Sequence, residues 1–247
     1  MNEEIAALIE LHRGLERLGP GSREFSLQIL ASLPTLREAP RIADLGCGAG
    51  AATLLLAEWF NVPVKAVDLS GVFLQHLDAR AAELGLTPMI QTFHADMGAL
   101  NWPEQSLDLL WSEGAAYNLT FPGALNAWRP LLTPGGLAVV SELSWFSDNP
   151  PEEARDFWAA AYPTLAGEQA NTRHAREANF EVLATRRLPT ACWWEFYYGP
   201  LLERVEALRA QADPVMSQVI HDTEVEIDLF RRYAAEYGYT FYILRAR

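Results

Sequence analysis

The fold is decided by the stretch Arg41-Ile42-Ala43-Asp44-Leu45-Gly46-Cys47-Gly48-Ala49-Gly50, which is followed by the apolar run Ala51 to Leu56. A short aliphatic run that leads into three alternate glycines and then a helix-forming segment predicts a strand, a tight turn and a helix. Because glycine lacks a Cβ, such a turn can approach a ligand closely and can adopt positive φ. The first N–H groups of the following helix are unpaired donors. The stretch therefore predicts a nucleotide-binding turn.

Two ligands fit this turn. Gly46, Gly48 and Ala51 match the dinucleotide pattern G-x-G-x-x-G/A, and Asp68 lies about 20 residues beyond, where a carboxylate binds ribose. An NAD-dependent oxidoreductase therefore stays open. Asp44, two residues before the first glycine, favours a different ligand, since its carboxylate could meet a cationic amino-acid group.

With Asp44 the run reads D-x-G-x-G-x-G, which resembles the first motif of the class I S-adenosylmethionine-dependent methyltransferases. The resemblance continues through Asp68, Asp96, the apolar strand expected at 107–112 and "LLTPGGLAVVSE". "GPGS", "WSEGAAYN", "SELSWF" and "YGYTFYIL" resemble bacterial small-molecule methyltransferases related to the ubiquinone and menaquinone enzymes. The resemblance implies an α/β fold: a Rossmann-like, doubly wound, seven-stranded and mostly parallel sheet with one antiparallel strand, plus a helical cap.

We expect one methyltransferase domain over residues 1–247. Its parts are N-terminal helices (1–38), a cofactor-binding core (39–145), cap insertions (146–175 and 190–236) and a last strand (237–247). Apolar spacing predicts an amphipathic helix over 3–18, with His12 as a core or boundary residue, and Ser22 as the cap of a second helix. The strong β character of the last strand predicts an edge strand.

The resemblance implies S-adenosyl-L-methionine as cofactor. Asp68 would accept its ribose hydroxyls, Asp96 its adenine amino group, and the backbone near Met97 would contact the ring. The residues expected to bind the cofactor are Asp44, Gly46, Cys47, Gly48, Gly50, Asp68, Leu69, Asp96, Met97 and Ser112.

The methyl group of such a cofactor is already activated, so the protein mainly aligns the reactants and excludes water. A base is needed only for an acceptor that must lose a proton. The catalytic candidates are Glu113, Tyr117 and Glu142, which follow or end apolar strands. Equally open is a reading in which these glutamates only bind backbone or the cofactor's amino group.

Asn118, Trp145, Trp193 and Tyr197 are expected to contact the acceptor. The aromatic run 193–198 could form a lid, because adjacent tryptophans should point apart so that one turns toward the pocket. The alternative is that these rings seal the cap against the sheet. Aromatic walls with a few acids suit an apolar or cationic acceptor.

The net charge of −13 and the pI near 4.8 argue against nucleic-acid or membrane partners and favour a small-molecule acceptor. Two cysteines and five histidines form no metal-ligand spacing, so we expect no metal. The N-terminus lacks a secretory signal and no apolar run reaches about 18 residues. A cytoplasmic monomer or homodimer is expected, either an enzyme or a non-catalytic cofactor-binding regulatory protein.

Overall fold

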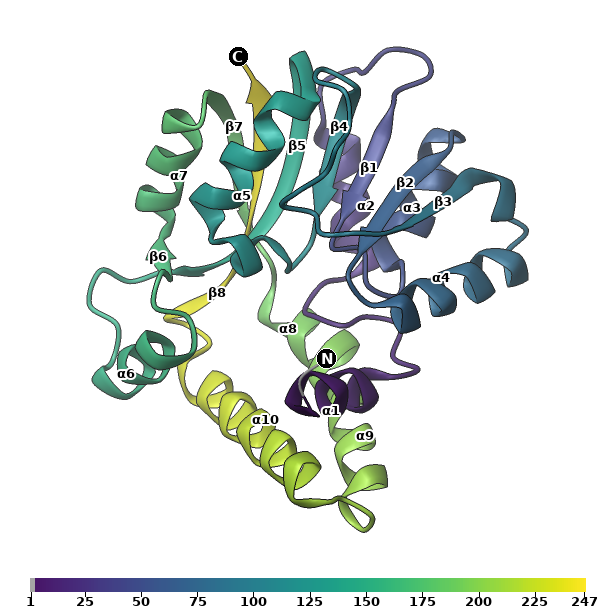
Figure 1. Ribbon diagram of the computed structural model, residues 1–247. Coiled ribbons are helices and arrows are strands. Elements are labelled where there is room, and N and C mark those ends of the chain that lie inside the picture. The colour runs from purple at the N-terminus through teal and green to yellow at the C-terminus, as the bar shows by residue number, and fades with distance from the viewer. Residues whose placement is uncertain (1–2) are drawn as a thin grey trace.

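A single twisted sheet forms the centre of the protein, in a computed structural model that describes residues 3–247 (Figure 1). The strands follow the order β3-β2-β1-β4-β5-β8-β7, and the two-residue β6 pairs with the end of β5. Neighbours from β3 to β5 are parallel, whereas β8 is antiparallel to both β5 and β7. The strands are β1 (Ile42–Leu45), β2 (Val64–Asp68), β3 (Ile90–His94), β4 (Leu107–Ser112), β5 (Leu132–Trp145), β6 (Ala166–Gly167), β7 (Phe180–Arg187) and β8 (Tyr237–Ala246). The expected seven-stranded, mostly parallel sheet is confirmed, with β6 as a small addition.

The prediction that the last strand lies at the sheet edge is wrong. β8 lies between β5 and β7, and β7 is the edge strand. Tyr237, Phe241, Tyr242 and Leu244 of β8 are fully buried, because both of its faces are covered. A strand buried on both faces shows β-branched and aromatic residues without alternation, so the sequence "YTFYIL" fits the interior of a sheet equally well.

Helices cover both faces of the sheet. α2 (Arg23–Ser32) and α3 (Ala51–Phe60) share a core with Ile42 and Leu109, and α4 (Gly71–Glu83) packs against β2 and β3 on the same side. α5 (Phe121–Trp128) and α7 (Glu168–Glu177) pack together on the opposite face, over Ala43 and Leu110. Alternate residues of the strands thus supply the two cores, as period-two side-chain geometry requires. Ser22 caps α2 as expected, since its hydroxyl oxygen accepts a hydrogen bond from Phe25 N.

A second group of helices lies beyond the carboxyl ends of the parallel strands (Figure 1). It comprises α1 (Glu3–His12), α8 (Thr190–Trp193), the π-helical turn η4 (Trp194–Tyr198), α9 (Gly199–Arg209) and α10 (Pro214–Tyr233). α1 packs against both α9 and α10, so segments from the two ends of the chain form one cap. α1 ends six residues earlier than expected, at a turn in which Gly14 has φ +82°. α6 (Glu152–Ala161) lies beside β6.

Short single turns complete the described chain: η1 (Thr87–Met89), η2 (Ala116–Leu119) and η3 (Arg129–Leu131). No helix within residues 3–247 is both long enough and apolar enough to cross a lipid bilayer.

The aromatic run 193–198 is helical, and its two tryptophans share neighbours. The rings of Trp193 and Trp194 both contact Tyr198 and Phe230. The expectation that they point apart is therefore wrong, because neighbours on a helix differ by only about 100° and rings this large can converge on one partner. Trp193 is 3% exposed and stacks on Phe230 at a centroid distance of 4.1 Å, so it seals α10 against the sheet.

Replacing this seal should destabilise the whole fold. We expect Trp193→Ala to lower the free energy of unfolding by about 3–5 kcal/mol, the usual cost of deleting a buried large aromatic side chain. Urea denaturation measures the effect. Phe196→Ala, at a ring that is 40% exposed in the same run, is the control and should cost far less. Equal losses in both variants would contradict the assignment of Trp193 to the core.

Candidate functional site

The glycine turn after β1 adopts a left-handed backbone conformation, which glycine accommodates most easily. Gly46, Gly48 and Gly50 have φ of +72°, +53° and +83°. A Cβ on Gly46 would overlap the Cβ of Ala115, and one on Gly50 would overlap the side chain of Leu77. The backbone N–H groups of Gly46 and Cys47 both donate to Val67 O at 2.9 Å, which fixes the turn to the end of β2. Only glycine fits these positions.

Asp68 at the end of β2 is tied to the same turn. Its carboxylate accepts hydrogen bonds from Gly48 N and Ser70 N, each at 2.8 Å. Burial raises the pKa of Asp68, while these two N–H groups and the neighbouring His94 act in the opposite direction. A carboxylate oxygen has two lone pairs, so each oxygen can still accept a hydroxyl from a ligand. This arrangement can hold a diol beside the glycine turn.

Asp44 lies beneath the turn, within the protein. It is 1% exposed, and its Oδ2 accepts a hydrogen bond of 2.6 Å from Thr53 Oγ1 on α3. Burial raises the pKa of Asp44 to about 7, against the lowering effect of the Thr53 hydrogen bond. A cationic group bound nearby would favour the charged carboxylate. Within residues 3–247 no Lys, Arg or His forms an ion pair with Asp44, and the charge of Arg17 lowers its pKa less than the Thr53 hydrogen bond does.

The other expected cofactor residues surround this turn in different ways. Leu69, which directly follows Asp68, is 67% exposed. Its apolar side chain is therefore accessible for contact with a flat ring. Asp96 is exposed on the loop after β3, where its Oδ1 accepts a hydrogen bond from Gly98 N. Met97 is buried, and its carbonyl accepts from Trp128 Nε1.

Two of the expected residues have their side chains engaged within the protein. The hydroxyl of Ser112 donates to Leu45 O, which joins β4 to β1. Burial raises the pKa of the Cys47 thiol well above its usual value, so Cys47 stays protonated and contributes packing. Any contact of these two residues with a ligand would therefore come from their backbone.

Glu113, a catalytic candidate, lies at the end of β4 in a saturated hydrogen-bond network. Its carboxylate accepts from Arg17 Nη1, Ser26 Oγ and Trp111 Nε1, all at 2.8 Å. The side chains of Arg17 and Glu113 are each only 9% exposed. These three donors engage both carboxylate oxygens, so the arrangement fits a residue that holds Arg17 in place and not one that transfers a proton.

This ion pair fastens the segment between α1 and α2 over the glycine turn. Gly21 lies against the pair, and a Cβ there would overlap the Arg17 guanidinium. Leu18 of the same segment covers the turn, since its Cδ1 would lie 2.8 Å from a Cβ on Gly48. The sequence "GPGS" is thus explained by a need for space beside Arg17.

The second glutamate candidate, Glu142, is buried in β5. It is 2% exposed, and its Oε1 accepts a hydrogen bond of 2.7 Å from Tyr162 OH. Burial raises the pKa of Glu142 to about 8. The ring of Tyr162 contacts Tyr117, the phenol candidate on η2, edge to face. Glu142 and Tyr117 are therefore neighbours in one polar and aromatic group, to which Glu113 does not belong.

The residues expected to contact the acceptor are dispersed. Asn118 donates to Ala115 O within its own turn. Trp145 contacts the ring of Tyr237, and Trp193 belongs to the core described above. Tyr197 lies near Tyr117, which adds to the effect of burial in raising the pKa of Tyr197. Tyr117 and Tyr197 both add in the same way to the raised pKa of Tyr239.

Sequence reasoning missed Glu226, Tyr239 and the polar role of His12. Glu226 lies on the apolar stripe of α10 and accepts a hydrogen bond from Tyr198 OH at 2.8 Å. His12 is hydrogen-bonded to Tyr197 OH at 3.2 Å and to Leu8 O, and burial lowers its pKa. An acid on an otherwise apolar helical face was the signal that could have identified Glu226.

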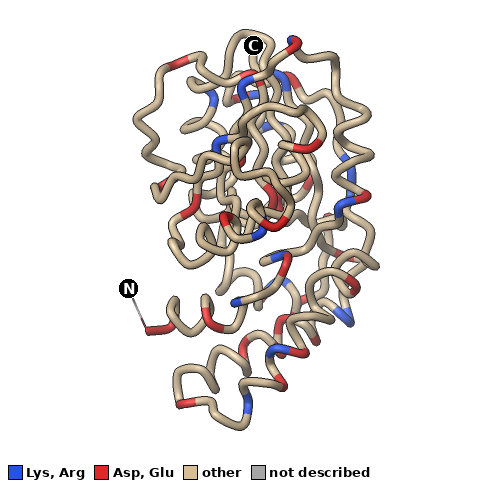
Figure 2. The backbone as a smooth tube through the Cα atoms, turned by 90° about the vertical axis from the view of Figure 1, so that its right-hand side faces the viewer, with Lys and Arg blue, Asp and Glu red and all other residues tan. Residues whose placement is uncertain are grey.

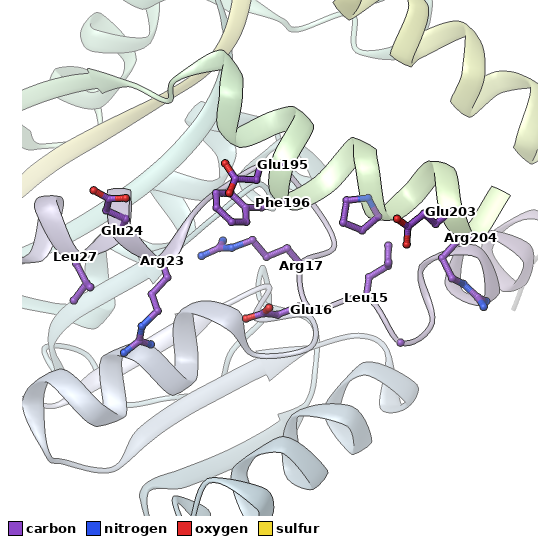
Figure 3. Close-up of a pocket in the computed structure, with 12 residues that line it drawn as sticks. Leu15, Glu16, Arg17, Arg23, Glu24, Leu27, Glu195, Phe196, Glu203 and Arg204 are labelled. Atoms are coloured by element: carbon purple, nitrogen blue, oxygen red, sulfur yellow. The ribbon is translucent and has the colours of Figure 1, made fainter. Parts of the chain in front are cut away.

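A separate hollow lies outside the Arg17 and Glu113 pair, between the segment 14–17, α2 and α9 (Figure 3). Its volume is about 840 Å³. The arginines that line it, Arg17, Arg23 and Arg204, are bound to Glu113, Glu58 and Glu10 respectively. None of the site residues predicted from the sequence lines this hollow.

Basic side chains form no extended surface on the described chain. Lys and Arg positions are scattered along the backbone and interspersed with more numerous Asp and Glu (Figure 2). Many of the arginines pair with a nearby acid, as Arg187 does with Glu168 and Arg245 with Glu181.

Comparisons with known proteins agree with this geometry. Residues 42–136 match a family model described as a methyltransferase domain. Trans-aconitate 2-methyltransferase of Escherichia coli O157:H7 is 30% identical over 196 residues, covering 76% of this chain and 69% of that protein. Phosphoethanolamine N-methyltransferase 1 of Arabidopsis thaliana is 26% identical over 154 residues, 62% of this chain and 31% of that protein, so the chain matches about a third of its length.

The fold is also shared with solved structures. A SAM-dependent methyltransferase from Geobacter sulfurreducens, in complex with S-adenosyl-L-homocysteine, superposes with a TM-score of 0.79 at 19% identity. The match covers 100% of this chain and 99% of that one.

The pair of Arg17 and Glu113 can be tested as a structural clamp. We expect Arg17→Met and Glu113→Gln each to lower the free energy of unfolding by about 3–5 kcal/mol, because each leaves a buried partner unpaired. The double variant should lose clearly less than the sum of the two. Urea denaturation of the four proteins supplies this cycle. Additive losses would show that the two side chains do not depend on each other.

Glu142 predicts a pH-dependent stability of defined sign. Its pKa is raised in the folded protein from 4.5 to about 8, so between these values the folded state binds more protons than the unfolded state. Stability should therefore fall as pH rises from about 5 to 8, by a few kcal/mol for this group. Glu142→Gln should remove this loss and melt above the parent protein at pH 8 but not at pH 5.

Melting temperatures across this pH range provide the measurement. The exposed substitution Glu24→Gln controls for the change in net charge and should leave the pH dependence of the parent unaltered. A parent and a Glu142→Gln variant with parallel profiles would refute the raised pKa.

Proposed function

The chain belongs to the class I S-adenosylmethionine-dependent methyltransferases, and from this premise we propose that it methylates a small acceptor held between the strand ends and the cap of α1, η4 and α10. The enzyme uses S-adenosylmethionine as its cofactor. The similarities do not support the two alternatives, an NAD-dependent oxidoreductase and a non-catalytic regulatory protein. The observation that carries the proposed site is the direct hydrogen bond from the glycine turn, at Gly48 N, to Asp68.

The residues at this edge fit the cofactor's parts. Positive φ and the absence of Cβ atoms at Gly46 and Gly48 leave the backbone accessible. We assign Asp68 to the ribose hydroxyls and the exposed pair Leu69 and Asp96 to the adenine ring and its amino group. Asp44, buried without an ion-pair partner, is assigned to the amino-acid end.

When bound, S-adenosylmethionine supplies a methyl group on a cationic sulfur that in-line attack can displace. The protein's part is to align the acceptor and to exclude water. The cap helices and the clamped segment around Leu18 exclude water. Glu142 is the residue suited to take up a proton from the acceptor, since a pKa of about 8 is close to that required of a base at neutral pH. Glu113 holds Arg17, and Tyr117 and Tyr197 line the acceptor space.

The expected partners, location and oligomeric state are also proposed. The charge of −13 supports the exclusion of nucleic acid. The free thiols of Cys47 and Cys192 support a cytoplasmic location. A monomer or homodimer is proposed. The named relatives act on trans-aconitate and on phosphoethanolamine, so they leave both acidic and amine acceptors open for this chain.

Asp68→Ala tests the cofactor assignment. We expect it to weaken binding of S-adenosylhomocysteine by about 2–3 kcal/mol, because the ribose hydroxyls lose a charged acceptor. Isothermal titration calorimetry measures the dissociation constant. Asp78→Ala, at an exposed carboxylate on the neighbouring helix α4, is the control and should bind as the parent does. An unchanged constant in Asp68→Ala would remove Asp68 from the site.

A further inference from the structure

Four tyrosines from different elements lie near the carboxyl ends of the parallel strands: Tyr117 on η2, Tyr162 after α6, Tyr197 on η4 and Tyr239 on β8. Tyr117 contacts Tyr162 ring to ring. The Tyr239 hydroxyl would lie 3.0 Å from a Cβ on Gly114, directly after Glu113 at the end of β4. Burial raises the pKa of Tyr239, and Tyr117 and Tyr197 raise it further. These phenols therefore form one group at the strand ends.

Two carboxyl groups from different elements lie beside these tyrosines. Glu142 comes from β5 and Glu226 from α10, and each accepts one hydrogen bond from a phenol. Tyr117 is 47% exposed, yet its pKa is raised by desolvation of the hydroxyl and then by the charges of Glu226 and Glu142. The same two acids act on Tyr239. The charges of both carboxyl groups therefore act on the same tyrosines.

Neither carboxyl has a cationic partner. In residues 3–247, no Lys, Arg or His forms an ion pair with Glu142 or Glu226. Arg17 is bound to Glu113. His12 has its pKa lowered by burial, which keeps its imidazole neutral at pH 7. An anionic acceptor would therefore meet two acids and no available positive charge.

A buried polar group nearby also lacks a partner. Tyr237 is fully buried, and its hydroxyl has no hydrogen bond of normal geometry in the described chain. The indole N–H of Trp158, which acts on the pKa of Tyr237, is likewise unsatisfied. Burial is the largest cause of the raised pKa of Tyr237, and the charge of Glu226 raises it further. The Tyr237 hydroxyl therefore lies near Glu226. Trp158 lowers the pKa of Tyr237 as a hydrogen-bond donor, so the indole N–H and the hydroxyl face each other.

We infer that the acceptor is an amine, whose positively charged nitrogen is recognised by Glu226 and Glu142 within the ring of tyrosines. This inference rests on the proposed function. Aromatic faces attract a cation, and carboxylates supply the charge that balances it. Burial raises the pKa of both acids, and a bound ammonium group would stabilise their charged forms.

The chemical step is balanced in protons and electrons. The acceptor ammonium gives one proton to the carboxylate of Glu142, which exposes the nitrogen lone pair. That pair forms the new C–N bond, while the C–S bond breaks and its electrons remain on sulfur. The product is a methylated ammonium, the cofactor loses its positive charge, and the proton leaves from Glu142 to solvent.

Binding of matched probes tests the inference. Three compounds of similar size differ in charge: N-methylbenzylamine, benzyl alcohol and benzoate. Calorimetry is performed at pH 8 on the full chain saturated with S-adenosylhomocysteine. We expect the amine to bind at least tenfold more tightly than the alcohol, and benzoate to bind more weakly than both. Glu226→Gln should reduce amine affinity at least tenfold and change alcohol affinity less than twofold.

Glu226→Gln retains an oxygen that can accept from Tyr198, so the fold should persist. Asp222→Asn, an exposed substitution on the same helix, is the control and should match the parent. The inference is overturned if benzoate binds as well as the amine, if the amine binds no better than the alcohol, or if Glu226→Gln behaves like Asp222→Asn. Failure of S-adenosylhomocysteine itself to bind would instead refute the proposed function.

Discussion

The hydrogen-bonded ion pair between Arg17 and Glu113 is the contact on which the site depends. It joins a segment that precedes the sheet in sequence to the end of the central strand β4. Two charges removed from water are stable only when their remaining hydrogen-bonding capacity is filled, and Ser26 and Trp111 fill that of the carboxylate. The pair therefore determines where Leu18 lies over the glycine turn, and with it the path by which a ligand reaches Asp68.

The sequence predicted well those features that depend on neighbouring residues. The turn at Gly46 to Gly50 and the cap at Ser22 both follow from local conformational preference. The order of the first five strands follows from the family resemblance. Local preference, however, carries no information on which strands become neighbours.

The features that the sequence did not reveal depend on distant contacts. β8 was expected at the edge, because its own residues do not show that β7 pairs beyond it. Glu113 looked like a base, because its donor Arg17 lies 96 residues away. Glu226 was overlooked among the other charges of α10, since only the packed cap shows that it faces Tyr198 and not solvent. The part played by an ionisable side chain is set by its partners, and those come from the tertiary structure.

The position of β8 has a consequence for how the protein forms. β8 follows all other strands of the sheet in sequence, yet it lies between β5 and β7, where it pairs with nine residues of β5 from Leu137 to Trp145. Until residues 237–246 have left the ribosome, β5 presents an open edge and β7 has no neighbour. Folding therefore requires contacts between segments far apart in sequence, which slows the reaction and exposes an aggregation-prone intermediate. A nascent chain stalled before residue 237 should be a substrate for chaperones, because β7 then has no partner strand and one edge of β5 is open.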